Sequence, residues 1–473
     1  MSLARFGYGS CNQLMEIQQE SKIIIGESYQ IDIIGLTHDG EGVGRIGKMV
    51  VFVPQAIPGD LVIAKVISVK KTYARALINQ MIKSSSDRIE PSCSLVKQCG
   101  GCQLAHLQYD KQLYWKQQHV SEALKRIGKI KANVLPIIGM ENPTAYRNKA
   151  QIPVAFQNQE LVMGFYQKRS HNIVDLEYCQ IQHPLISKAV QVMKRILVEL
   201  GIAPYDEQNH TGVLRHVVIR VSFSEKALMI LMVTRTRKIP QLNELISRLR
   251  HEIPELESIM QNVNPAVTNV IYGSETRLLW GKPYLIDEIG KLKFVISARS
   301  FFQVNPIQTK ILYDVVKKAV FLTGKETVWD LYCGIGTIGL YLAENAGQLI
   351  GVEIIPEAVE DARLNAKCNG IEHAVFYLGK AEVIAPKLVR QGLRPDVIIV
   401  DPPRKGCELS LLQTISQVKP AQIVYVSCNP ATLARDLEIL NTMGYAIDMV
   451  QPVDVFPQTY HVECVVLMSR VDK

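Results

Sequence analysis

The chain has 473 residues, of which 47% are hydrophobic and 21% are charged, and its formal net charge is +8. This composition excludes an intrinsically disordered chain and supplies apolar material for more than one core. At roughly 100–200 residues per domain, the length predicts two to four domains. The small positive charge is compatible with a polyanionic partner but does not require one.

No run approaches the roughly 18 apolar residues that a membrane span needs, and the first twenty residues show no secretory signal. We therefore expect a cytoplasmic protein. Its ten cysteines then need metal-binding, catalytic or packing explanations, because cytosolic thiols stay reduced. Residues 1–23 match no recognisable element, and we expect an N-terminal lead without a defined fold there.

Residues 24–83 predict a small β-barrel of the oligonucleotide-binding type. Strand-like runs at 29–36, 49–53 and 61–69 alternate with turns that contain glycine or proline, and five short strands of this kind are typical of such a barrel. A solvated face of an accessory barrel is the alternative explanation for its basic side, which consists of Lys65, Lys70, Lys71, Arg75 and Lys83.

Residues 84–300 indicate one mixed α+β domain. It contains strand-like runs such as 217–222 and 227–233, and helical patterns near 110–128, 184–201 and 240–251.

Residues 301–473 predict a doubly wound, Rossmann-like α/β domain. Strand-like runs at 327–331, 349–353, 375–378, 396–400 and 423–427 alternate with helical patterns that begin at 337, 356, 408 and 431. This alternation is typical of a parallel sheet covered by helices on both faces. The last two strand-like runs, at 446–450 and 461–468, have no helix between them.

The loop after the first of these strands is a candidate cofactor site. Gly334, Gly336 and Gly339 match G-x-G-x-x-G, and Glu353 ends the next strand, so a dinucleotide is one interpretation. Asp330 stands at the strand end, where its carboxylate would repel a pyrophosphate. The loop therefore favours a cationic, phosphate-free cofactor such as S-adenosylmethionine.

Two further motifs follow strands of the same sheet. Asp401-Pro-Pro-Arg and Ser427-Cys-Asn-Pro place Asp401 and Cys428 at the carboxyl edge, where ligands bind in such sheets. A thiol between a strand end and a helix N-terminus is placed for a lowered pKa and for nucleophilic attack. An inert buried cysteine is the alternative. Glu463, on the last strand, could reach the same cleft, although a polar residue on an edge strand explains it equally.

A thiol and a carboxylate together suit methylation of uracil carbon-5. A thiolate that adds at carbon-6 creates electron density at carbon-5, and this carbon can then attack a sulfonium methyl group. A base must next remove the carbon-5 proton so that the thiolate leaves. Because the base must leave any stack, we expect flipping or a single-stranded target.

Four cysteines, Cys93, Cys99, Cys102 and Cys179, have spacings that suit a metal site. Tetrahedral zinc and a four-iron cluster are both chemically possible on the spacing alone.

Together these motifs resemble the RNA uracil-5-methyltransferase family from about residue 24 onward. The resemblance implies a TRAM RNA-binding barrel, S-adenosylmethionine as methyl donor and a [4Fe–4S] cluster on the four cysteines. It implies that Cys428 is the nucleophile and Glu463 the proton acceptor. It also implies cofactor contacts by Gln303, Tyr332, Gly334, Gly336, Thr337, Glu353 and Asp401.

Within the family, a barrel plus a cysteine cluster resembles the 23S rRNA (uracil-C5)-methyltransferases, so we expect 5-methyluridine in 23S rRNA as the product. Uridine-54 of tRNA is the alternative target, and an NAD-linked oxidoreductase or a non-catalytic RNA-binding protein are the alternative classes. We expect a monomer, basic residues concentrated around the cleft and barrel, and a cluster that does structural and RNA-positioning work rather than redox catalysis.

Overall fold

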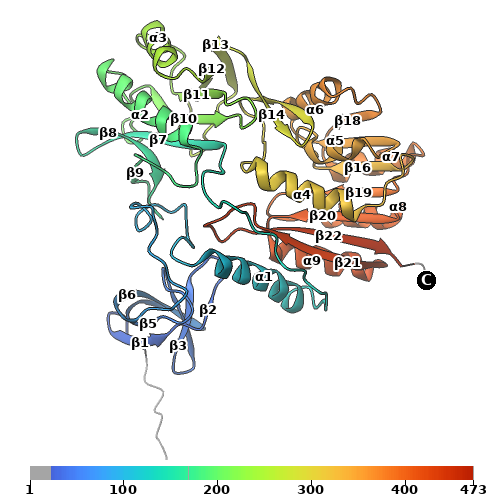
Figure 1. Ribbon diagram of the computed structural model, residues 1–473, viewed down its shortest axis with the longest axis horizontal. Helices are drawn as coiled ribbons and strands as arrows, with labels where there is room; N and C mark the ends of the chain where they lie inside the picture. The colour runs from blue at the N-terminus through green and yellow to red at the C-terminus, as the bar shows by residue number, and fades with distance from the viewer. Residues whose placement is uncertain (1–22, 169, 472–473) are drawn as a thin grey trace, which may run out of the picture. The chain divides into compact units, whose positions relative to one another are not determined.

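The computed structural model (Figure 1) describes residues 23–168 and 170–471. Nearly all of the expected N-terminal lead, including Cys11, lies outside the described residues. The chain divides between Arg88 and Ile89 into two compact units. This boundary lies close to the predicted end of the barrel at residue 83, whereas the predicted division near residue 300 lies inside the second unit.

The first unit is a curled sheet of six strands in the order β1–β5–β6–β4–β3–β2, one strand more than the sequence predicts. Fully buried Val62, Ala64 and Val66 alternate along β5 with more exposed residues, because successive side chains of a strand point to opposite faces. Gly44 permits a close approach, since a Cβ atom there would lie 2.3 Å from Ile31 Cγ2. The strands are β1 (Ser28–Asp32), β2 (Gly35–Leu36), β3 (Gly42–Ile46), β4 (Met49–Val53), β5 (Leu61–Val69) and β6 (Tyr73–Lys83).

The predicted basic side of this unit is only partly available to a ligand. The guanidinium of Arg75 is paired with the carboxylate of Glu41 at 2.8 Å. The four lysines of the set are exposed, namely Lys65, Lys70, Lys71 and Lys83.

The second unit contains a mixed seven-stranded sheet, here called the central sheet, in the order β13–β12–β11–β10–β7–β8–β9. Helices α2 (Pro184–Glu199) and α3 (Leu242–Glu252) pack on one face, and the hairpin of β14 (Tyr284–Ile289) and β15 (Leu292–Ser297) contacts the other. Only β11 and β12 run parallel. The strands are β7 (Lys149–Gln157), β8 (Glu160–Tyr166), β9 (Ile173–Asp175), β10 (Leu214–Val221), β11 (Leu228–Thr234), β12 (Leu256–Val263) and β13 (Glu275–Gly281).

The second seven-stranded sheet of this unit, here called the catalytic sheet, has the order β18–β17–β16–β19–β20–β22–β21. The first five strands of this order run parallel, and β22 runs antiparallel to both of its neighbours. The dinucleotide-binding fold has the order 3-2-1-4-5-6, so the reversed final hairpin separates this sheet from it. The strands are β16 (Thr327–Leu331), β17 (Gln348–Glu353), β18 (Ala374–Leu378), β19 (Val397–Val400), β20 (Gln422–Ser427), β21 (Tyr445–Val453) and β22 (Glu463–Arg470).

Helices cover both faces of the catalytic sheet, as predicted (Figure 1). One face packs against α4 (Pro306–Ala319), α5 (Thr337–Ala343) and α6 (Pro356–Cys368). The other packs against α7 (Ala381–Arg390), α8 (Leu409–Val418) and α9 (Pro430–Thr442). Helix α7 is missing from the sequence interpretation; it contains Pro386, a residue that normally interrupts helices.

Helix α1 (Tyr109–Arg126) belongs to the layer of α9 rather than to the central sheet. Its Val120 and Leu124 are buried in the same core as Leu433 and Leu437 of α9. The segment after α1 continues along this edge, because Val134 and Ile138 form parallel bridges with β21. Among the described residues, no helix is long and apolar enough to cross a membrane.

Candidate active site

A cavity of about 1180 Å³ lies at the carboxyl ends of the parallel strands of the catalytic sheet. In doubly wound sheets ligands bind at this edge, where the strand order reverses; here that point lies between β16 and β19. Seven of the nine predicted catalytic and cofactor residues line the cavity, namely Gln303, Tyr332, Gly334, Glu353, Asp401, Cys428 and Glu463.

The other two predicted cofactor residues, Gly336 and Thr337, do not line the cavity. Gly336 precedes α5 with a left-handed φ of 82°, a conformation that glycine adopts without a steric penalty. The Thr337 hydroxyl is hydrogen-bonded to the Tyr313 hydroxyl at 2.8 Å. Both residues therefore support the conformation of the loop without lining the cavity.

The loop after β16 is held mainly by backbone contacts. Tyr332 has a φ of 74°, which is rare for a residue with a side chain and recurs at ligand clamps. The amide of Gly334 donates to Glu353 Oε2 at 3.0 Å, and Glu353 Oε1 accepts from the amides of Ile354 and Ile355 at 2.7 and 2.9 Å. Glu353 thus joins the loop to the start of α6.

Asp330 does not stand where the sequence interpretation placed it. It is 1% exposed, does not line the cavity, and accepts from the amide of Gly339 at 2.8 Å. Burial, together with the nearby Asp401 and Glu353, raises its pKa to about 7. Its role is to anchor α5 beneath the loop, and the carboxylates that line the cavity come from other strands.

Cys428 and Glu463 are brought together by the register of the sheet. Ser427, the last residue of β20, pairs with Cys464 of the antiparallel strand β22. One step further along the same register, Cys428 follows β20 where Glu463 begins β22. Glu463 is 4% exposed, and both residues line the cavity.

The predicted lowering of the Cys428 pKa is wrong for the ligand-free protein. Burial, followed by the charges of Glu463 and Asp401, raises the pKa of this thiol to about 11, although Arg404 acts in the opposite direction. The N-terminus of α9 favours a thiolate, but desolvation and two carboxylates outweigh it. Burial also raises the pKa of Asp401 to about 7, and burial and Asp401 raise that of Glu463 well above its usual range.

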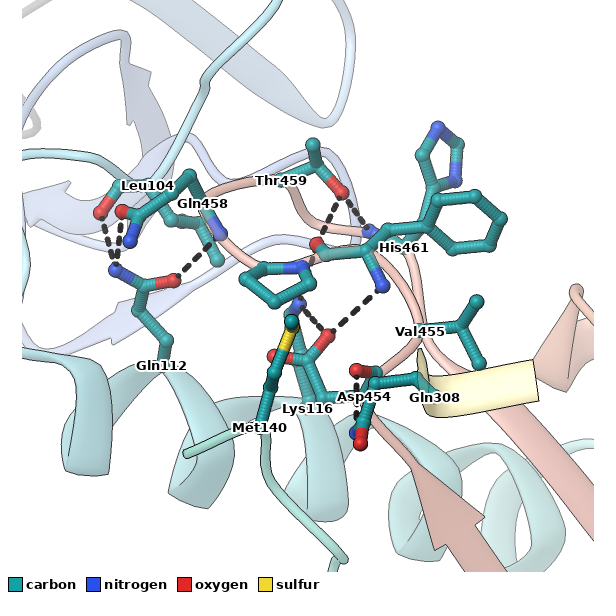
Figure 2. Close-up of polar contacts among 12 residues, drawn as sticks. Leu104, Gln112, Lys116, Met140, Gln308, Asp454, Val455, Gln458, Thr459 and His461 are labelled. Carbon is teal, nitrogen blue, oxygen red and sulfur yellow. Dashed lines mark hydrogen bonds and ion pairs between the residues drawn. The ribbon is translucent and has the colours of Figure 1, made fainter. Parts of the chain in front are cut away.

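Residues 454–462 connect β21 to β22, and we call them the catalytic strap. Val453, the residue before it, pairs with Glu463, the residue after it. The ammonium of Lys116 on α1 donates to Asp454 Oδ1 at 2.6 Å and to the carbonyl of Phe456 at 3.0 Å (Figure 2). Both charged side chains are buried, at 1% and 0% exposure. The ion pair therefore fixes the start of the strap, and Glu463 directly follows its end.

Three further residues hold the catalytic strap through four hydrogen bonds. The amide of Gln112 donates to Gln458 Oε1 at 3.0 Å and accepts from the Gln458 backbone amide at 3.0 Å (Figure 2). Gln308 on α4 donates to the carbonyl of Asp454 at 2.9 Å, and the Tyr109 hydroxyl donates to Asp454 Oδ2 at 3.0 Å. Residues of two helices that are distant in sequence, α1 and α4, thus converge on this connection.

Arg404 and His461 are among the cavity residues that have no role in the sequence interpretation. Arg404 donates to His461 Nε2 at 3.2 Å, and both line the cavity with Cys428. Their positions were visible in the sequence, because Arg404 follows Asp401-Pro-Pro and His461 lies two residues before Glu463.

The expected concentration of basic residues around the cleft is not found. The basic residues that line the cavity are Arg147, Arg299, Lys380, Arg404 and Lys405, and the acidic ones are Glu353, Glu357, Glu382, Asp401, Glu408 and Glu463. A cavity of such mixed charge can accept a cation and a polyanion at different places.

The four predicted metal ligands are free, half-buried thiols. Burial raises the pKa of Cys99, and the charges of Cys179 and Cys93 raise it further; the pKa of Cys102 is raised in the same way by all three other cysteines. The thiols therefore lie within electrostatic reach of one another. Among residues 23–168 and 170–471, however, no group of three or more His, Cys, Asp or Glu side chains could hold a metal ion.

Known families and structures match this arrangement. A family described as tRNA (uracil-5-)-methyltransferase matches residues 108–471, and a TRAM domain matches residues 24–78. Uncharacterized RNA methyltransferases of Halalkalibacterium halodurans and Clostridium acetobutylicum are 50% and 49% identical, over 96% and 94% of this chain and 99% and 97% of theirs.

Among solved structures, the tRNA (uracil-54, C5)-methyltransferase of Pyrococcus abyssi, in complex with S-adenosyl-L-homocysteine, is 29% identical to this chain. The two superpose with a TM-score of 0.75 over 93% of this chain and 100% of the other.

Fold, cavity and matches together define an S-adenosylmethionine-dependent RNA methyltransferase. The chain belongs to the tRNA (uracil-5-)-methyltransferase family and carries an N-terminal TRAM domain. These matches exclude the NAD-linked oxidoreductase and the non-catalytic RNA-binding protein.

Proposed function

We propose that the protein methylates carbon-5 of a specific uridine in 23S rRNA, with Cys428 as nucleophile and Glu463 as proton acceptor. The observation that carries the chemical part is the register of β20 and β22, which brings a thiol and a buried carboxylate to one cavity wall. The substrate part rests on the combination of a TRAM domain and four grouped cysteines in one chain.

Each residue has a step that matches its surroundings. Cys428 loses its proton to solvent and adds to carbon-6 of the flipped uracil, after which carbon-5 takes the methyl group. Glu463 then accepts the carbon-5 proton, and the thiolate is eliminated. Glu463 must be ionised at this step, and its raised pKa then makes the carboxylate a stronger proton acceptor. The sulfonium charge of the methyl donor would offset the carboxylates that oppose the Cys428 thiolate.

Most of the proposed cofactor contacts line the same cavity. We assign Glu353 to the ribose hydroxyl groups, a role supported by its position at the end of β17 and in the cavity lining. Gln303, Tyr332, Gly334 and Asp401 line the same space, and Gly336 and Thr337 support the conformation of the loop.

We also propose that Cys93, Cys99, Cys102 and Cys179 hold a [4Fe–4S] cluster. The donor set fits, since four free thiols lie within electrostatic reach of one another. A four-iron cluster takes one thiolate per iron, so its sulfurs are spread more widely than four thiolates on one zinc ion at about 2.3 Å each. Iron and sulfide analysis of anaerobically purified protein tests this; a Cys102→Ser variant should lose both.

The tRNA alternative is favoured by one observation, namely the similarity over 93% of this chain to an enzyme named for uridine-54 of tRNA. Mass mapping of 23S rRNA and tRNA from a strain without this protein separates the two. Loss of 5-methyluridine from 23S rRNA alone is the expected result, and loss from tRNA alone would replace the proposed substrate with tRNA.

The catalytic proposal is tested with RNA that contains 5-fluorouridine at the mapped position. Because fluorine cannot be removed as a proton, the wild-type protein should form a stable covalent complex with this RNA in the presence of S-adenosylmethionine. Cys428→Ala should form none, and Cys407→Ala, which changes a buried cysteine outside the cavity, is the matched control. Full turnover by Cys428→Ala would refute the mechanism.

A further inference from the structure

Three cations lie together at the start of the central sheet, and among the described residues none is paired with a carboxylate. Lys149 on β7 pairs directly with Arg220 on the antiparallel strand β10. Arg147 precedes the first residue of β7 by two positions, and its charge acts on Lys149. We call these three residues the cationic cluster.

Arg220 is the buried member of the cationic cluster, at 2% exposure. Its Nη2 donates to the carbonyl of Ser300 at 2.7 Å, whereas its Nε and Nη1 have no partner. Two carboxylates, Asp287 and Asp361, act on its charge without contacting it. Asp287 Oδ1 accepts from three backbone amides at 3.0–3.1 Å, and its Oδ2 has no hydrogen-bond partner. Asp361 accepts from the Ser297 hydroxyl at 2.7 Å. The Arg220 charge therefore has no contacting counter-ion within the described chain.

The cationic cluster is unfavourable in the ligand-free protein. Like charges directly opposite each other in a strand pair destabilise a sheet. Burial, followed by the charges of Arg220 and Arg147, lowers the pKa of Lys149 to about 7. Native proteins tolerate such local conflicts mainly where a ligand resolves them.

The position of the cationic cluster indicates which ligand this is. Arg147 lines the catalytic cavity, as do Arg299 and Ser300. Asn148, between Arg147 and Lys149, donates to the carbonyl of Gln303 at 3.1 Å and to the carbonyl of Val304 at 2.9 Å. The cationic cluster thus borders the segment that leads to the proposed cofactor contact, at the rim of the cavity.

We propose that the cationic cluster is a phosphate-binding subsite that holds the RNA backbone next to the target uridine. Arg147 and Lys149, which are half-buried, contact the phosphodiester oxygens, and Arg220 reinforces the charge from beneath. Most protein contacts to a nucleic acid go to its phosphates and fix its register. The subsite depends on the RNA substrate and not on the proposed role of Cys428.

A carboxylate presents similar chemistry, and the methyl donor carries one, so the experiment must distinguish the two anions. Binding of the mapped RNA is measured over a range of salt concentrations for wild-type protein and for Lys149→Met. S-adenosyl-L-homocysteine binding and the thermal midpoint are measured on the same samples. Lys318→Met, which removes an exposed lysine from α4, is the matched control for the loss of one charge.

Lys149→Met should raise the RNA Kd about tenfold and reduce the slope of log Kd against log salt by about one. Its Kd for S-adenosyl-L-homocysteine should stay within about twofold of wild type. Its thermal midpoint should equal or exceed that of wild type, because a like-charge contact is removed. The covalent complex with 5-fluorouridine RNA should still form at saturating RNA, so failure here and failure of the Cys428 mechanism are separable.

Three results would overturn this proposal. Unchanged RNA affinity and salt slope would show that no phosphate is held there. A weakened affinity for S-adenosyl-L-homocysteine with unchanged RNA binding would assign the cationic cluster to the cofactor carboxylate. A lowered thermal midpoint or failure to fold would make Lys149 structural. Arg147→Gln, at a half-buried position, provides the second variant and should show the same RNA defect.

Discussion

The two walls of the catalytic cavity are built in different ways. The loop at residues 332–336 is short and is shaped by left-handed backbone at Tyr332 and Gly336 and by one carboxylate from the next strand. The catalytic strap, which contributes Phe456 and His461 to the lining and which we take as the second wall, is held by buried side chains, chiefly the ion pair of Lys116 and Asp454. The first wall depends on neighbours in sequence, whereas the second depends on a helix more than 300 residues away.

This difference has a consequence for each wall. A backbone-shaped loop tolerates changes in distant parts of the chain but is sensitive to an added side chain. A connection held by a buried ion pair is sensitive to one distant substitution, because removal of one partner leaves an uncompensated buried charge. We expect substitutions that disturb the loop to weaken cofactor binding, and substitutions that disturb the catalytic strap to slow proton removal.

The largest effect is expected for Lys116→Met. The carboxylate of Asp454 would remain buried without its cation, which should destabilise the protein by about 3–5 kcal/mol. Denaturant unfolding measures this loss. Lys129→Met, which breaks an exposed pair with Glu438, is the control and should cost less than about 1 kcal/mol.

The double variant Lys116→Met/Asp454→Asn distinguishes stability from positioning. It removes both charges, so most of the lost stability should return, while turnover should stay about tenfold below wild type because the strap before Glu463 is no longer held. Affinity for S-adenosyl-L-homocysteine should be unchanged. Wild-type turnover in this variant would show that the ion pair only stabilises the fold.

Gly336→Ala should have the next largest effect. A Cβ atom there would lie 3.1 Å from Leu340 and 3.2 Å from Phe376, in a left-handed conformation, and we expect a cost of about 1–2 kcal/mol. Calorimetry should also show weaker binding of S-adenosyl-L-homocysteine. Gly370→Ala is a matched control, since Gly370 has a φ of 67° and open space around it; unchanged cofactor binding in both variants would contradict the proposed role of the loop.

The pH dependence of stability should depend on Asp330, whose carboxylate accepts from the amide of Gly339 in α5. Burial raises the Asp330 pKa from 3.8 to about 7, so its contribution to stability is complete below pH 3.8 and is lost as the pH rises to about 7. The thermal midpoint should therefore fall between about pH 4 and 7, and Asp330→Asn should flatten that fall by a few degrees. Asp314→Asn is the control, because hydrogen bonds with Lys310 and Tyr341 outweigh burial and lower the Asp314 pKa, outside this window. An equal slope in Asp330→Asn and wild type would contradict the raised pKa.

The smallest effect concerns the reactivity of Cys428 in the ligand-free protein. With a pKa of about 11, the thiolate fraction should rise about tenfold per pH unit between pH 7 and 9, and alkylation should follow it. Peptide mass spectrometry after iodoacetamide treatment measures the rate at this residue. Arg404→Gln should slow alkylation about twofold, because Arg404 lowers the Cys428 pKa. A rate that is flat from pH 7 to 9 would indicate a thiolate already formed.

Sequence patterns predicted the parts of this molecule that depend on local order. The strands before Asp401 and Cys428 could be recognised because short apolar runs were followed by proline-containing turns, and both residues line the predicted cavity. The position of Cys428 before a helix N-terminus predicted a lowered pKa, and this prediction was wrong. Burial and the charges of Glu463 and Asp401, which lie on or after other strands, raise the pKa instead.

The remaining features depend on contacts between distant residues. Lys116 looks like an ordinary polar residue of a helix, and only the packing of α1 against the catalytic sheet turns it into the anchor of the catalytic strap. Lys149 and Arg220 lie 71 positions apart and become neighbours only through the pairing of β7 with β10. No periodicity or spacing in the sequence encodes such a pairing.

The role of Glu463 as proton acceptor is tested most directly with natural uridine RNA and S-adenosylmethionine that carries a labelled methyl group. The Glu463→Gln variant should add Cys428 to the base and transfer the methyl group, but it should not release the product. A labelled protein–RNA adduct should therefore accumulate, and turnover should fall about 10²–10⁴-fold. Turnover at the wild-type rate without an adduct would contradict the proposed chemistry.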